Sequence, residues 1–148
     1  MEDVRVSAKL MGGYVEFVIY NSSKEFAAPI IDEAIEECKA LESIFSFYDK
    51  KSELSMLNQK RKMKVSNKLK EVIEIALKYC KMSEGAYDIT LGKKFLARKD
   101  GGKMPDVFCS YKDVKVEKNN ITLTHPDALI DLGSIAKGFI GDEIIEFF

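Results

Sequence analysis

The segment best suited to chemistry reads Asp131-Leu132-Gly133-Ser134-Ile135-Ala136-Lys137-Gly138. A predicted strand ends at the carboxylate of Asp131, a glycine turns the chain, and a helix begins with Lys137 in its first turn. The unpaired N–H groups and partial positive charge of a helix N-terminus suit an anion such as phosphate, and a lysine adds a full charge. The spacing is neither GxGxxG nor that of a P-loop. The segment therefore predicts either an anion-binding site or a capped structural helix.

A second candidate segment is Gly85-Ala86-Tyr87-Asp88-Ile89-Thr90. It combines a glycine that ends a helix, an aromatic face and a carboxylate, which together could stack on and hydrogen-bond a planar heterocycle. A turn with a core tyrosine explains the same residues.

A third candidate places aromatic residues in a polar loop. It begins with Phe45-Ser46-Phe47-Tyr48-Asp49 and continues through Ser52-Glu53-Leu54 to Leu57-Asn58. These residues fit a ligand wall and the packing of a helix end equally well.

The sequence offers few residues for other catalytic sites or for metal sites. The only histidine, His125, lies in a predicted turn after a strand, which excludes two-histidine metal sites and indicates a solvated loop histidine. The three cysteines, Cys38, Cys80 and Cys109, are widely spaced without a CxxC pair. This spacing is not typical of a disulfide framework or a zinc knuckle and fits a reducing compartment.

Composition limits the class of protein. The 148 residues are 46% apolar and 32% charged, which predicts one globular domain over residues 1–148. Lysine and arginine number 23 against 24 acidic residues, and this net charge of -1 argues against a nucleic-acid binder. No apolar run reaches the roughly 20 residues that span a bilayer. The N-terminus shows neither a leader nor a lipid-attachment cysteine, so we expect a cytoplasmic protein.

The first half of the chain predicts a hairpin and two helices. Alternating residues from Val4 to Met11 and the run from Tyr14 to Tyr20 predict two strands joined by a Gly12-Gly13 turn. Helical spacing predicts a regular helix from Pro29, which suits a first turn, to Ser46. The segment from Phe47 to Gln59 is predicted to be irregular. The basic run that follows it, from Lys60 to Lys64, is predicted to be a solvated strand edge or turn.

A second helix is capped by Ser66 and ends at Gly85. The elements predicted beyond it are a brief helix over Leu91–Ala97, a hairpin of Val114–Glu117 with Ile121–Thr124, a buried strand end over Leu129–Leu132, and a last helix from Gly133-Ser134. Because the strands come in hairpins, the order of elements predicts an α+β fold with a largely antiparallel sheet.

Together, the three candidate segments resemble the ApbE family. These are the FAD:protein FMN transferases, formerly described as thiamine-biosynthesis lipoproteins. The matching motifs are Phe45-Ser46-x-Tyr48, Ser52-Glu53-Leu54-Ser55-x-Leu57-Asn58, Gly85-Ala86-Tyr87-Asp88-x-Thr90-x-Gly92, and Asp131 to Gly138 with Asp142. The resemblance runs from about Met11 to the end of the chain. It implies an α+β, T-fold-like architecture with antiparallel hairpins packed on helices.

The resemblance also implies an activity and its cofactors. Family members bind FAD and, with a magnesium ion, split its pyrophosphate. They transfer FMN to a threonine or serine hydroxyl of a target flavoprotein and release AMP. Carried over by motif, the residues that would border or hold the flavin cofactor are Met11, Tyr48, Ala86, Tyr87 and Asp88. Asp131 and Lys137 would bind it near the adenosine and diphosphate end, and Ser134 would offer a main-chain oxygen to the metal.

This sequence departs from the family pattern in two ways. Ser134 stands where many relatives have glycine or alanine, which is compatible with a role for its backbone alone. The family is also about twice as long, and its second half supplies the Asp and Thr side chains that hold magnesium and a histidine-containing segment near the reaction centre. His125 does not match that histidine, so the catalytic residues are expected in the absent C-terminal half.

The resemblance therefore leaves several expectations. The chain is an incomplete copy of the enzyme, pairs with a complementary half, or binds flavin without turning it over. Besides a flavin transferase and a flavin-binding module, the sequence leaves a further class of function open. This is an interaction subunit that keeps the scaffold and forms a homo-oligomer through Phe139, Ile144 and Phe147.

Overall fold

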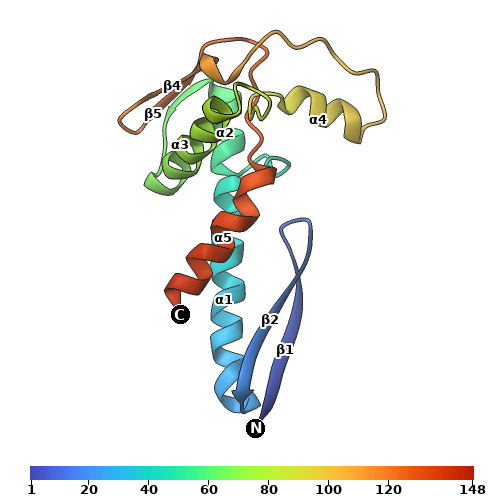
Figure 1. The fold of residues 1–148 in the computed structure, drawn as a ribbon, viewed down its shortest axis with the longest axis vertical. Helices are drawn as coiled ribbons and strands as arrows, with labels where there is room; N and C mark the ends of the chain where they lie inside the picture. The colour runs from blue at the N-terminus through green and yellow to red at the C-terminus, as the bar shows by residue number, and fades with distance from the viewer. The chain divides into compact units, whose positions relative to one another are not determined.

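The computed structural model describes residues 1–148, which form two compact units (Figure 1). We call Met1–Ser43 with Lys137–Phe148 the hairpin unit, and Ile44–Ala136 the sheet unit. The prediction of one domain over residues 1–148 stays a prediction. No helix is both long enough and apolar enough to cross a bilayer.

The hairpin unit begins with the predicted β-hairpin. Strands β1 (Glu2–Leu10) and β2 (Gly13–Ser22) pair antiparallel, with Leu10 opposite Gly13. The two residues between them, Met11 and Gly12, have φ of 54° and 73°. Two positive φ values define the type I′ turn that suits the twist of a hairpin. The predicted Gly12-Gly13 turn is thus one residue too late, because Gly13 already pairs in β2.

Helix α1 (Lys24–Phe45) follows β2, and its predicted start at Pro29 is wrong. Ser23 caps the helix, since its hydroxyl oxygen accepts a hydrogen bond from the N–H of Phe26 at 3.3 Å. Pro29 lies inside the helix and removes the N–H that would bond to the carbonyl of Glu25. Both residues are exposed, so that carbonyl lies on the solvent side of the helix.

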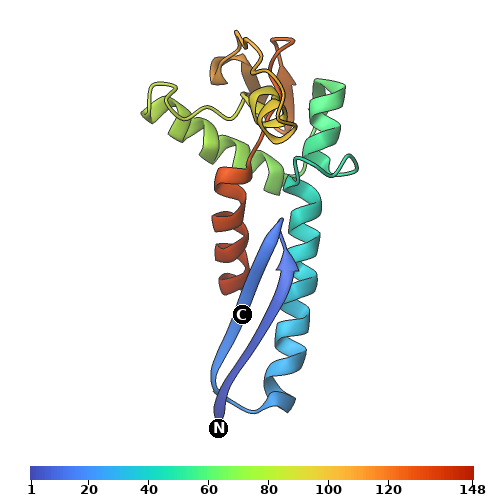
Figure 2. The ribbon, with the colours of Figure 1, turned by 90° about the vertical axis from the view of Figure 1, so that its right-hand side faces the viewer.

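The hairpin runs alongside α1, and the later part of α5 (Gly133–Phe147) completes this unit (Figures 1 and 2). Cys38 is buried on the apolar stripe of α1. The buried apolar residues of the hairpin unit are Leu10, Ala27, Ile31, Ala34, Cys38, Leu41, Ile140 and Ile144.

The sheet unit contains a helix that the sequence analysis missed. Helix α2 (Glu53–Lys60) lies in the segment predicted to be irregular. Its N-cap is Ser52, whose hydroxyl oxygen accepts from the N–H of Ser55 at 3.0 Å, and it buries Leu54 and Leu57. The helix is short, and only two apolar side chains mark its buried face, so its periodicity is weak.

Helix α3 (Asn67–Met82) confirms the predicted second helix. Ser66 is its N-cap, and its hydroxyl oxygen accepts from the N–H of Leu69 at 3.2 Å. Beyond its C-terminus, Gly85 has φ of 83° and its N–H donates to the carbonyl of Cys80 at 2.9 Å. Helix α4 (Gly92–Lys99) confirms the brief helix predicted over Leu91–Ala97.

A three-stranded antiparallel sheet closes this unit, in the order β3-β5-β4. A 3₁₀ turn, η1 (Tyr111–Asp113), leads into β4 (Val114–Glu117), which forms the predicted hairpin with β5 (Asn120–Leu123). The basic run forms the exposed edge strand β3 (Lys62–Lys64). The antiparallel hairpins and their helices confirm the α+β fold class.

The strand end predicted over Leu129–Leu132 is corrected to an extended segment with one isolated bridge. Leu129 pairs in parallel with Leu91, and no further ladder forms. Ala128, Ile130 and Leu132 are buried. The apolar character of this run therefore indicates burial and not a strand.

Candidate functional site

The approach to α5 is held by two side chains around α2. The amide of Asn58 pairs with both main-chain groups of Ile130: its Oδ1 accepts from the N–H at 2.8 Å, and its Nδ2 donates to the carbonyl at 2.9 Å. Arg61 donates to the carbonyls of Ala128, at 2.6 Å, and His125. These bonds fix the segment that precedes α5 and give the third candidate motif a structural role.

Main-chain hydrogen bonds bring the two remaining motifs side by side. The N–H of Leu129 donates to the carbonyl of Thr90 at 3.1 Å, and that of Asp131 donates to the carbonyl of Ile89 at 2.9 Å. The N–H of Gly92 returns a bond to the carbonyl of Leu129 at 2.9 Å. The turn that contains Tyr87 and the first turn of α5 therefore belong to one local structure.

The carboxylate of Asp88 organises the turn itself. Its Oδ1 accepts from the N–H of Thr90 at 2.9 Å and from the hydroxyl of Thr90 at 2.6 Å. Its Oδ2 accepts from the N–H of Tyr111 at 3.0 Å. Both oxygens are engaged within the protein, so the side chain of Asp88 shapes the site, and the assigned contact with the cofactor stays a prediction.

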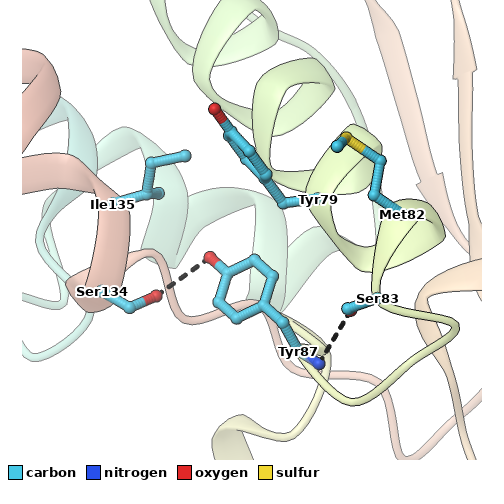
Figure 3. A pocket seen from close by; sticks show the side chains of 6 residues that line it. All are labelled: Tyr79, Met82, Ser83, Tyr87, Ser134 and Ile135. Carbon is cyan, nitrogen blue, oxygen red and sulfur yellow. Dashed lines mark hydrogen bonds between the residues drawn. The ribbon is translucent and has the colours of Figure 1, made fainter.

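A pocket of about 510 Å³ lies beside this turn (Figure 3). Its volume falls within the range of small-molecule sites, roughly 300–1,000 Å³. The lining residues come from the end of α3, the following turn and the start of α5, and are Tyr79, Met82, Ser83, Tyr87, Ser134 and Ile135. All of them belong to the sheet unit.

Tyr87 is held at both ends. Its phenol oxygen lies 2.9 Å from the hydroxyl oxygen of Ser134, and its N–H donates to the hydroxyl of Ser83 at 3.0 Å (Figure 3). Burial raises the pKa of the Tyr87 phenol, while the hydrogen bond with Ser134 opposes that shift. The phenol is therefore neutral near neutral pH. Aromatic and apolar walls with two serine hydroxyls suit a planar ring better than a charged group.

The structure brings together most of the predicted site residues. Ala86 is exposed in the turn next to Tyr87, and Asp131 and Ser134 lie at the start of α5. Tyr48 is in the same unit but does not line the pocket. Its ring is half exposed and lies under the Lys99 ammonium group, with 3.7 Å between Nζ and the ring centroid.

Two predicted site residues belong to the hairpin unit. Met11 is the first residue of the β1–β2 turn and is half-buried. Lys137 is exposed on α5. The roles that the family resemblance assigns to both residues stay predictions.

The residues of this chain do not form a magnesium site by themselves. No group of three or more His, Cys, Asp or Glu side chains is arranged to hold a metal ion. Oδ1 of Asp131 accepts from the N–H of Gly133 at 2.8 Å, so this oxygen is engaged at the turn into α5. The main-chain oxygen of Ser134 stays the one predicted ligand.

Sequence reasoning missed Tyr79, Met82 and Ser83 as lining residues, whereas Ile135 stood in the first candidate segment without an assigned role. Tyr79 and Met82 are 50% and 67% exposed, and they lie outside the stripe of buried apolar residues on α3. An exposed aromatic and a methionine at i and i+3 share one side of a helix, directly before a candidate motif. That combination is the feature of the sequence that could have identified Tyr79 and Met82 as lining residues.

Comparisons with known proteins identify the family of the chain and related folds. The ApbE family model matches residues 11–148. The fold resembles the flavin transferase ApbE from Vibrio cholerae at a TM-score of 0.80 and 23% identity, covering 99% of this chain and 53% of that one. It also resembles the ApbE protein from Thermotoga maritima at a TM-score of 0.82 and 21% identity, covering 98% and 52%.

A flavinyl transferase ApbE from Pseudomonas stutzeri gives a TM-score of 0.79 at 17% identity, covering 98% of this chain and 52% of that one. The chain thus spans about half the length of these solved structures. No curated protein matches it. Since the family model covers nearly the whole sequence, the chain belongs to the ApbE family.

Proposed function

We propose that this chain is the N-terminal, FAD-binding portion of a magnesium-dependent FAD:protein FMN transferase. The observation that carries the proposal is the pocket at which the Ala86–Asp88 turn meets the start of α5. Two family motifs that lie far apart in the sequence share this one small-molecule-sized site. The aromatic walls suit a ring system of FAD.

The proposed reaction moves FMN from FAD to a target flavoprotein. The oxygen of a Thr or Ser hydroxyl on the target bonds to the phosphorus of the FMN half, and the bond from that phosphorus to the bridging oxygen breaks. AMP leaves with that oxygen, and the proton of the attacking hydroxyl is released to solvent. Bound magnesium would neutralise the charge that builds on the leaving phosphate. The roles of this chain's residues are to bind and orient FAD, with Lys137 assigned to the diphosphate.

The first test is binding of FAD to this chain, followed by flavin fluorescence. We expect saturable binding that Lys137→Ala weakens, because a cation paired with phosphate is lost. Lys9→Ala removes an exposed lysine from the hairpin unit and should leave the affinity unchanged. Equal affinities for all three proteins would contradict the role of Lys137.

The second test is transfer. The chain, FAD, Mg²⁺ and a target flavoprotein are mixed with and without a polypeptide that corresponds to the remaining half of a solved relative. We expect covalent flavin on the target and an equal amount of AMP only in the complemented mixture. Absence of both products there would overturn the transferase proposal.

A non-catalytic FAD-binding module is the second candidate. It is favoured by the absence of a cluster of metal-ligating side chains in a chain that spans about half of its relatives. This module would bind FAD and release no AMP in any mixture, so the transfer assay separates the two candidates.

A further inference from the structure

The hydroxyl of Ser134 has a partner that its assigned role does not require. The family resemblance gives this position a main-chain oxygen only. In the structure, Oγ of Ser134 lies 2.9 Å from the phenol oxygen of Tyr87 (Figure 3). A glycine or alanine at this position has no group that could form this bond.

This bond completes a two-ended support for Tyr87. At its backbone end, the N–H of Tyr87 donates to the hydroxyl of Ser83, which in turn donates to the carbonyl of Cys80 in α3 at 3.1 Å. At its phenol end, Ser134 ties the ring to the first turn of α5. A tyrosine that is fixed at both ends keeps one orientation of its ring, since only two side-chain torsions connect those ends.

The fixed ring borders the pocket. Tyr79 and Met82, which project from α3, line the same pocket (Figure 3). Because a preformed wall avoids the entropy cost of ordering a side chain on binding, fixing Tyr87 raises the affinity for a flat ligand.

We propose that Ser134 is a positioning residue, whose hydroxyl holds the Tyr87 ring as a preformed wall against which a planar ring system of FAD packs. The inference rests on the proposed function for the identity of the ligand. Either ring system of FAD, the isoalloxazine or the adenine, has the required planar chemistry.

The first measurement requires no ligand. It is a double-mutant cycle on stability, measured by urea denaturation of the wild type, Ser134→Ala, Tyr87→Phe and the double variant. Because the two oxygens share one hydrogen bond, the double variant should lose no more stability than the less stable of the single variants. Ser134→Thr keeps a hydroxyl and should restore the wild-type stability. Additive losses in the double variant would overturn the contact.

The second measurement is a double-mutant cycle on FAD affinity. Loss of one neutral hydrogen bond should weaken binding about three- to tenfold in Ser134→Ala and in Tyr87→Phe. The double variant should be no weaker than either single variant, because all three lack the same bond. Ser134→Thr should bind like wild type, and Ser43→Ala on exposed α1 is the matched control. Wild-type affinity in Ser134→Ala, or additive losses in the double variant, would overturn the proposal.

FMN and AMP as separate probes identify the ring that packs on Tyr87. The affinity for one of them should fall in Ser134→Ala, and loss for neither would contradict the packing. If the wild-type chain binds no FAD, the proposed function fails and the packing of a ligand ring fails with it. The ligand-free stability cycle then decides whether Ser134 holds Tyr87.

Discussion

The carboxylate of Asp88 is satisfied by three hydrogen bonds from Thr90 and Tyr111, all within the sheet unit. An acidic residue in a family motif is easily taken for a ligand contact. Here the geometry gives it an additional, ligand-independent role, because two of those bonds come from main-chain N–H groups that no other group on the turn satisfies. A substitution of Asp88 should therefore change the stability of the protein even when no cofactor is present.

We expect Asp88→Asn to lower the free energy of unfolding by about 1–3 kcal/mol without FAD. The new NH₂ group would face groups that donate hydrogen bonds to the carboxylate, and it cannot accept from them. Urea denaturation followed by circular dichroism measures the change. Asp106→Asn, an exposed loop position, is the matched control and should stay within about 0.5 kcal/mol of wild type. Wild-type stability in Asp88→Asn would show that the three bonds contribute little.

Gly92 marks a close approach between two main-chain segments. A Cβ atom at this position would lie 2.5 Å from the carbonyl oxygen of Leu129 and 3.0 Å from the ring of Phe47. We expect Gly92→Ala to destabilise the protein by about 1–3 kcal/mol, because main chain must move to relieve the overlap. Gly141→Ala is the control, since its Cβ would meet nothing within 4 Å and its helix should gain about 0.5–1 kcal/mol. Equal unfolding midpoints for the two variants would contradict this argument.

Residue types identified the motifs from the sequence, but not the partners of their side chains. Asn58 stood in a candidate ligand wall, yet its amide pairs with the main chain of Ile130, far along the sequence. A sequence shows that a side chain is polar and does not show which distant backbone it reaches. The same limit hid the Tyr87–Ser134 contact, whose partners come from different elements.

Among the elements, those with strong local signals were predicted and those set by tertiary contacts were not. The two hairpins have clear turns and alternation, and α3 has both its cap and its apolar stripe. Helix α2 is short. The segment before α5 is held by Asn58, by Arg61 and by main-chain bonds to Ile89 and Thr90, without a continuous strand ladder. The sequence does not show that Pro29 lies on an exposed face of α1, where solvent can satisfy the carbonyl that loses its partner, so the predicted start of the helix is too late.

Helix α2 depends on Ser52, which is fully buried. Its hydroxyl accepts from the N–H of Ser55 and donates to the carbonyl of Ser46, so it caps the helix and ties it to the preceding loop. We expect Ser52→Ala to cost about 2 kcal/mol, measured by urea denaturation. Ser43→Ala, at an exposed position of α1, should change stability by less than about 0.5 kcal/mol. A loss no larger than that of the control would mean that α2 forms without its cap.

At the scale of the whole molecule, the two units differ in the size of their cores. Among the largest fully buried side chains, only Leu41 and Ile140 belong to the hairpin unit. The chain passes between the units within α1 and within α5. Because a small core contributes little stability, the hairpin unit should open at lower denaturant concentration than the sheet unit.

The buried cysteines report on each unit separately. Cys38 lies in the hairpin unit and Cys80 in the sheet unit, and burial raises the pKa of both thiols. At pH 8 the folded protein therefore holds less of the reactive thiolate than the unfolded chain, whose thiols have a pKa of about 8.5. Alkylation should be slow until the surrounding unit opens.

We expect a variant that keeps only Cys38 to be alkylated at lower urea concentration than one that keeps only Cys80. Mass spectrometry after a short pulse of iodoacetamide measures both, with the other cysteines replaced by alanine. Circular dichroism of the two variants is the control, because matching unfolding curves show that the replacements themselves did not shift stability. Coincident labelling midpoints would mean that the units unfold together, as the predicted single domain over residues 1–148 requires.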